Sequence, residues 1–211
     1  MRPVGPMRQS PVIVKIGGSL LSAAAPRLLL QRLAAERRVI LVPGGGVFAD
    51  AVRDAQPRLD LTDAACHAMA ILAMEQTAFA LADLCPALAG CRTEAELAAP
   101  RAGAALWFPA AMLLGAPDIA ESWDVTSDSL ALWLAHRLGA PRLILVKAPG
   151  ATVPGELVHG DRLEALAAAG ILDRAFARMA SGFAGSIVLV TADDSARLAA
   201  ALATGAGMDL R

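Results

Sequence analysis

Val12-Ile-Val-Lys-Ile-Gly-Gly-Ser19 is the stretch of sequence that decides the fold. Its β-branched residues favour a short buried strand, which the pair Gly17-Gly18 closes. Similar apolar runs occupy residues 39–42, 143–146 and 187–190. Buried apolar strands that alternate with helical patterns are typical of a parallel sheet covered on both faces. We therefore expect an α/β fold, a three-layer αβα sandwich around a mainly parallel central sheet.

Helical patterns separate these strands. Apolar spacing and cap signals predict helices over 22–38, 47–56, 61–84, 126–138, 161–169, 171–179 and 193–203. A strand and a short helix are expected within 87–101, and another strand over 104–108. The helix 61–84 is apolar nearly all round, which implies burial in the core or at an interface between subunits, and hence a homo-oligomer. With no repeat or linker, residues 12–211 are expected to form one domain behind a frayed leader, 1–11.

The composition excludes several classes of protein. Mean hydropathy is +0.52, but the longest uncharged run, residues 102–117, contains two glycines and two prolines, and a membrane-spanning helix needs about 20 mostly apolar residues. The N-terminus lacks the apolar core of a secretory signal. Three cysteines without metal-like spacing fit reduced thiols in the cytoplasm. A net charge of −1 without a basic stripe argues against a nucleic-acid partner.

Lysine is rare in this chain. Of 19 basic residues only Lys15 and Lys147 are lysines, and the others are arginines. Arginine replaces lysine well on a solvated surface but poorly where a compact point charge must fit a tight site. Each lysine stands at the end of an apolar strand pattern. Both are therefore candidates for chemistry, and chance retention at the surface is the alternative.

The first glycine-rich loop follows Lys15. Glycines 17 and 18 allow consecutive amides to form a nest for an anion, which Lys15 can also reach. An ordinary strand-to-helix turn is the alternative, and the rarity of lysine favours phosphate binding.

The second loop is Pro43-Gly-Gly-Gly46. Three glycines between a buried strand and a helix are more than packing alone is expected to need, so Gly44, Gly45 and Gly46 are candidates for contact with a ligand. With Ala49 they also match G-x-G-x-x-A, the dinucleotide motif. That motif wants an acidic residue at the end of the next strand, whereas Asp63 begins an apolar helix. The Walker pattern G-x-x-x-x-G-K-[ST] is absent.

Asp124 and Asp128 flank a predicted helix start that is rich in hydroxyl groups. Capping by Thr126 or Ser127, with Asp128 favoured by the helix dipole, explains part of this pattern. It does not need Asp124, which could orient the lysines or help hold magnesium. His67 lies on the long apolar helix, where a lone histidine is more often a packed core or interface residue than a ligand.

Taken together, these motifs resemble the amino acid kinase superfamily, from about residue 12 to residue 191. The resemblance implies a kinase that uses ATP and Mg²⁺. It implies that Lys15 and Asp128 are catalytic, with Asp128 organising the lysines. The implied phosphate- and nucleotide-binding residues are Gly17, Gly18, Ser19 and Lys147. The implied substrate-binding residues are Gly44, Gly45, Gly46, His67 and Asp124.

Within the superfamily, residues 67–74 and 122–133 are similar to a compact branch of furanylmethyl phosphate kinases, which serve methanofuran-type one-carbon cofactor biosynthesis. This similarity implies a small phosphomonoester acceptor, a diphosphate product and contact of His67 with the acceptor phosphate. Two features depart from the family: Lys147-Ala-Pro-Gly150 lacks the usual acid, and no later lysine follows. A kinase for a carboxylate or amino acid, and a non-catalytic nucleotide- or oxyanion-binding protein, remain alternatives. No dedicated protein metal site is expected.

Overall fold

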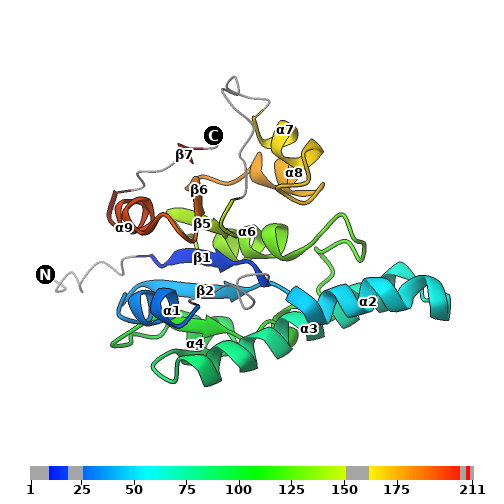
Figure 1. Cartoon of the computed structure of the whole chain (residues 1–211), viewed down its shortest axis with the longest axis horizontal. Helices are drawn as coiled ribbons and strands as arrows, with labels where there is room; N and C mark the ends of the chain where they lie inside the picture. The colour runs from blue at the N-terminus through cyan, green and yellow to red at the C-terminus, as the bar shows by residue number, and fades with distance from the viewer. Residues whose placement is uncertain (1–9, 19–25, 151–161, 205–207, 210–211) are drawn as a thin grey trace, which may run out of the picture.

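The computed structural model describes residues 10–18, 26–150, 162–204 and 208–209. Most of the predicted leader and the candidate Ser19 lie outside these residues. The described residues share one seven-stranded sheet of order β3-β4-β2-β1-β5-β6-β7 (Figure 1). The strands are β1 (Val12–Ile16), β2 (Val39–Pro43), β3 (Ala89–Cys91), β4 (Ala105–Trp107), β5 (Arg142–Lys147), β6 (Ser186–Thr191) and β7 (Met208–Asp209). Only β6 and β7 pair antiparallel, so the mainly parallel sheet is confirmed.

Successive residues along the central strands pack on opposite faces of the sheet. In β5, Leu143 and Leu145 join one apolar cluster, whereas Ile144 and Val146 join the other. This alternation follows from the two-residue period of a strand. Because both faces are apolar, both must be covered by helices, and the three-layer sandwich is confirmed.

Helices on the two faces come from different parts of the chain. Helices α1 and α9 cover one face, and α6, α7 and α8 cover the other (Figure 1). The long helix α3 contributes to both clusters. The helices are α1 (Pro26–Ala34), α2 (Gly46–Leu59), α3 (Asp63–Leu84), α4 (Glu94–Ala98), α5 (Ala110–Leu113), α6 (Ser127–Arg137), α7 (Arg162–Ala168), α8 (Phe176–Ala180) and α9 (Ser195–Thr204).

Most predicted elements form near their expected bounds, with three differences. The helix predicted over 171–179 is wrong in its first half, because α8 begins only at Phe176. The polar groups of residues 171–175 bind other elements of the fold instead of continuing a helix. Helix α5 and strand β7 have no counterpart in the predicted elements, since they are only four and two residues long and carry little periodicity.

Helix α3 is the one helix among the described residues that is long and apolar enough to cross a membrane. One side of it, with Ile71, Met74 and Leu81, is buried in the two clusters that line the sheet. Such packing against the sheet is typical of a core helix in a folded domain. The opposite side exposes Leu72 and Phe79, 45% and 57% of whose surfaces are accessible.

Candidate active site

The candidate residues gather where three parallel strands end. Ile16 at the end of β1 is in register with Pro43 of β2 and Val146 of β5. The Gly17-Gly18 turn, the triple-glycine loop and Lys147 therefore lie at one carboxyl edge of the sheet. In open α/β sheets this edge is where ligands bind.

Both lysines of the chain contact one buried carboxylate. The Nζ atom of Lys15 lies 2.9 Å from Oδ1 of Asp128, and Nζ of Lys147 lies 2.7 Å from Oδ2. Asp128 is only 5% exposed and Lys15 only 6%. Lys147 also donates a hydrogen bond of 2.6 Å to the carbonyl of Ile171. Two cations on one carboxylate leave a net positive charge at the strand edge, which suits an anionic ligand.

The environment shifts the ionisation of this cluster. Burial opposes the charge on Asp128, but the charges of Lys15 and Lys147 outweigh it, so the pKa of Asp128 is lowered. Burial, together with the charge of Lys15, lowers the pKa of Lys147 despite the attraction of Asp128. A buried cluster of this kind stays charged only while its partners remain in place.

Asp173, which the sequence reasoning missed, holds the first turn of α6. Its carboxylate accepts hydrogen bonds from the backbone amides of Thr126 and Ser129 and from both of their hydroxyls. Thr126 is the N-cap residue, as the capping pattern allowed, but its own side chain caps nothing. No local signal could have identified Asp173, because it lies 44 and 47 positions away from these partners.

The two glycine loops pack directly against each other. A Cβ atom on Gly18 would lie 2.1 Å from the backbone nitrogen of Gly46, and one on Gly44 would lie 2.7 Å from that of Gly18. Gly46 also has a φ of +54°, which favours glycine. Close packing of backbone on backbone therefore accounts for these glycines, contrary to the expectation that packing alone would not need them.

Two amides of the predicted ligand-binding loops are engaged with the backbone. The amide of Gly17 donates to the carbonyl of Val146, and the amide of Gly44 donates to that of Ile16. In this conformation these two amides are therefore not available to an anion, and the phosphate contact of Gly17 and the substrate contact of Gly44 stay predictions. Gly18, Gly45 and Gly46 instead line a cavity of about 130 Å³.

This small cavity lies at the start of α2 and α6. Its apolar wall consists of Ile71, Met74, Val125 and Leu130. His67 lines it too, and is only 6% exposed with no partner for Nε2 among the described residues. Burial lowers the pKa of His67, against a hydrogen bond with the backbone of Ser122 and the charge of Glu121.

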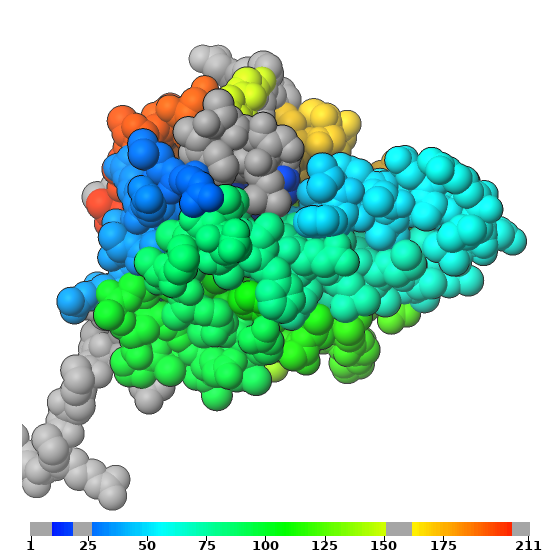
Figure 2. All heavy atoms as spheres, turned by 60° about the horizontal axis from the view of Figure 1, so that its bottom comes forward, coloured from blue at the N-terminus to red at the C-terminus, as the bar shows by residue number. Residues whose placement is uncertain are grey.

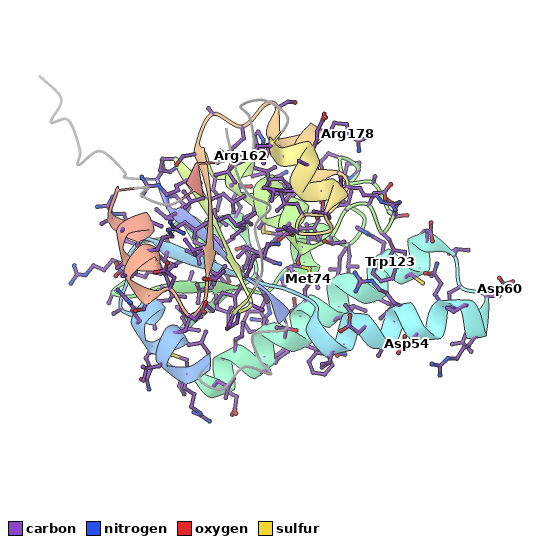
Figure 3. The ribbon with its side chains drawn as sticks, turned by 45° about the horizontal axis from the view of Figure 1, so that its top comes forward. Asp54, Asp60, Met74, Trp123, Arg162 and Arg178 are labelled. Atoms are coloured by element: carbon purple, nitrogen blue, oxygen red, sulfur yellow. The ribbon has the colours of Figure 1, made fainter. Side chains whose placement is uncertain are left out.

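A larger hollow of about 1150 Å³ adjoins the cavity. It contains Lys15, Asp128 and Lys147 and is bordered by α7 and α8. Its lining shares Arg53, Trp123 and Thr126 with the small cavity. In Figure 3, the labels of Met74, on α3, and of Trp123 stand on the side of the α2–α3 pair that faces the α7–α8 pair, where Arg178 is labelled. The lysine–aspartate cluster therefore faces a hollow that is continuous with the smaller one.

Asp124 does not contact the lysines. Its carboxylate lies 3.6 Å from the Arg174 guanidinium, and it lines the larger hollow rather than the small cavity. The expectation that Asp124 orients the lysines is wrong. Its place outside the small cavity also separates it from the predicted substrate-binding residues Gly45, Gly46 and His67, which line that cavity.

A second group that the sequence reasoning missed stands between the hollows. The guanidinium of Arg53, on α2, lies 4.5 Å from the centre of the Trp123 ring. The indole nitrogen of Trp123 donates to Gln56 over 2.7 Å, and Gln56 donates to Asp63 over 2.8 Å. Helix spacing places Arg53 and Gln56 on one face of α2, but only the fold brings Trp123 to them.

Comparison with known proteins agrees with this architecture. Residues 10–100 match the model of the amino acid kinase family. The chain is also 34% identical, over 142 residues, to the [5-(aminomethyl)furan-3-yl]methyl phosphate kinase of Methanocaldococcus jannaschii. That alignment spans 63% of this chain and 63% of the relative. These matches confirm the resemblance seen in the sequence.

Solved structures confirm the fold. The uridylate kinase of Archaeoglobus fulgidus superposes with a TM-score of 0.67 at 18% identity, covering 95% of this chain and all of that one. The UMP kinase of Ureaplasma parvum gives 0.61 at 14% identity, with 93% of each chain covered. The aspartate kinase of Synechocystis gives 0.60 at 13% identity, covering 88% of this chain and 38% of that one.

Proposed function

We propose that this chain, which has the fold of the amino acid kinase family, is an ATP-dependent kinase that phosphorylates a small phosphomonoester. One observation carries the proposal: the only two lysines of the chain lie on one buried aspartate, beside two adjoining hollows. Surface lysines would have no reason to converge in this way, and a phosphoryl-transfer site needs concentrated, well-placed positive charge.

The larger hollow is the proposed nucleotide site. ATP supplies the phosphoryl group, and Mg²⁺ bound with its phosphates offsets their charge. Lys15 and Lys147 stabilise negative charge on the moving group, and Asp128 holds their ammonium groups in place. The family's later lysine is missing, but Lys147 reaches Asp128 from the end of β5 and supplies a second cation. This contact weakens the case for a non-catalytic binding protein.

The small cavity is the proposed acceptor site. The start of α2, at Gly45 and Gly46, presents first-turn amides that have no partner within the helix and suit an anion. His67 and Arg53 are the side chains suited to the acceptor phosphate, and the apolar wall suits a compact ring. We propose an acceptor of the furanylmethyl phosphate type and a diphosphate product, within methanofuran- or methylofuran-type cofactor biosynthesis in the cytoplasm.

Arg53 also supports one alternative. A guanidinium binds carboxylates as readily as phosphates, in both cases through two parallel hydrogen bonds. A kinase for a small carboxylate or amino acid would therefore use the same cavity. Only the choice of acceptor separates the two functions.

The test is phosphoryl transfer by the purified protein with ATP and Mg²⁺. ADP release is measured against a panel of phosphomonoesters, including aminomethylfuranyl-methyl phosphate, and of small carboxylates and amino acids. Phosphorus NMR then identifies a new diphosphate product. Asp128→Asn is the inactive control. ATP binding without ADP release on any acceptor would favour the binding-protein alternative, and an acyl phosphate product would favour the carboxylate kinase.

We also propose that the protein is a homo-oligomer. The outer side of α3 exposes Met69, Leu72 and Phe79, and it runs across the face shown in Figure 2 between α1 and α2. A row of large apolar side chains along one helix is typical of a surface that a second subunit covers.

A further inference from the structure

We propose that Asp173 is a positioning residue that fixes Asp128, and through it both lysines, by holding the first turn of α6. The proposal rests on the kinase function proposed above. Asp173 lines the larger hollow, but its carboxylate is occupied by hydrogen bonds from α6, so we assign it a positioning role.

The contacts of Asp173 saturate its carboxylate. Oδ2 accepts from the amide of Thr126 at 3.0 Å, from the hydroxyl of Thr126 at 2.9 Å and from the amide of Ser129 at 2.9 Å, and Oδ1 accepts from the hydroxyl of Ser129. Asp128 lies between these two anchored residues. Its backbone is therefore held on both sides, and its side chain can keep one direction.

The segment around Asp173 also holds the other end of the cluster. The carbonyl of Ile171 accepts from Lys147, and the amide of Ala175 donates to the carbonyl of Asp124 over 2.9 Å. Residues 171–175 thus bind both α6 and Lys147. The same segment joins α7 to α8, which border the larger hollow, so it ties the wall of the proposed nucleotide site to the catalytic cluster.

A carboxylate at this position can accept all four hydrogen bonds, three on Oδ2 and one on Oδ1. An asparagine would keep only the three on its oxygen, and the Ser129 hydroxyl would have to turn round and accept from the NH₂ group. Burial raises the pKa of Asp173, although its hydrogen bonds from Ser129 and Thr126 favour the charged form. Partial burial of the Asp173 carboxylate costs free energy, and a serine or threonine side chain would cap a helix without that cost. Precise placement of Asp128 explains why this cost is tolerated.

Kinetics with a matched control provide the first test. Asp173→Asn should lower kcat by roughly 10- to 100-fold, because small misplacements of catalytic groups cost up to about a hundredfold. The KM values for ATP and acceptor should stay within about twofold, because the binding walls remain. Glu96→Gln is the control: Glu96 caps α4 by accepting from the amides of Arg92 and Thr93, next to β3 at the outer edge of the sheet. It should leave kcat unchanged.

A milder variant keeps the test valid if Asp173→Asn folds poorly. Ser129→Ala removes one hydrogen bond to Asp173, and Ser129 lines neither hollow. It should give a smaller fall in kcat of the same kind. A folded Asp173→Asn or Ser129→Ala protein with wild-type kcat, or one with changed KM alone, would overturn the proposal.

Lysine NMR provides a second test that needs no substrate. Protein labelled with ¹³C at lysine Cε should give two signals, since the chain has two lysines. Asp173→Asn should move both signals, because Asp128 contacts both lysines, and Glu96→Gln should move neither. Movement of the Lys147 signal alone would show only a local effect and overturn the proposal. Since these spectra do not depend on turnover, they separate failure of this inference from failure of the kinase proposal.

Discussion

Lys15 is the residue whose replacement most directly tests the proposed chemistry. Lys15→Arg keeps the charge but replaces a compact ammonium by a broad planar group at a site that is only 6% exposed. We expect kcat to fall by at least about a hundredfold, the typical loss on removing one well-placed electrostatic donor. Circular dichroism should show an intact fold. Arg142→Lys, at the opposite end of β5, is the control, and a near wild-type rate for folded Lys15→Arg would contradict a catalytic role.

Lys147 should set the alkaline limit of activity. Because its pKa is lowered in the folded protein, its ammonium loses the proton at a pH below the ordinary value of 10.5. Activity that needs this charge is present at lower pH and is lost as pH rises through the lowered pKa. The fall of kcat at alkaline pH measures this loss of charge. In Lys147→Arg this alkaline fall should disappear, because a guanidinium stays protonated. An unchanged alkaline fall would show that another group causes it.

His67 should affect the acceptor and not the nucleotide. It lines the small cavity and not the larger hollow, and its Nε2 atom lacks a partner among the described residues. His67→Ala should raise the KM for the acceptor about tenfold or more, the loss of roughly one hydrogen bond to a charged group, and leave the KM for ATP unchanged. His136→Ala, whose ring contacts Phe183 on another face, is the control. An unchanged acceptor KM would return His67 to a packing role.

The two glycine loops form one structural unit, and its tolerance to substitution is testable. Gly18→Ala would place Cβ 2.1 Å from the backbone of Gly46, where neither loop can yield without moving the cavity wall. We expect loss of activity and a fall in the free energy of unfolding of about 1–3 kcal/mol or more, as in overpacked cores. Gly182→Ala, whose Cβ would meet only His136 at 3.8 Å, should be tolerated. Thermal unfolding and ADP release measure both, and equal effects would contradict the interlocking of the loops.

The assembly should depend on α3. We expect light scattering at micromolar concentration to give an oligomer, and Phe79→Glu to shift it toward the monomer, because the substitution places a charge in an apolar interface. Leu59→Glu is the control, since Leu59 is 65% exposed at the end of α2. A monomeric wild-type protein, or an oligomer that survives Phe79→Glu and Leu72→Glu together, would contradict the proposed interface.

The sequence by itself determined the succession of strands and helices along the chain and the mainly parallel sheet. It also determined where the lysines, Asp128 and the glycine loops stand relative to those elements. These features follow from local patterns: β-branched runs make strands, and glycines mark turns at strand ends. The meeting of β1, β2 and β5 at one edge also follows, because neighbouring parallel strands share a direction. The rarity of lysine was itself informative, because it marked Lys15 and Lys147 as candidates for chemistry, and the structure places both on Asp128.

Only the tertiary structure decided which groups are paired and which are free. In the folded chain the amides of Gly17 and Gly44 are hydrogen-bonded to the backbone, and Asp124 pairs with Arg174. Asp173 accepts hydrogen bonds from the first turn of α6, and Trp123 lies beside Arg53. The tertiary structure also kept residues 171–175 out of a helix that their pattern favoured. Such pairings join segments far apart in the chain, and the free energy that selects them comes from burial and from satisfying polar groups there, which no local pattern of residues encodes.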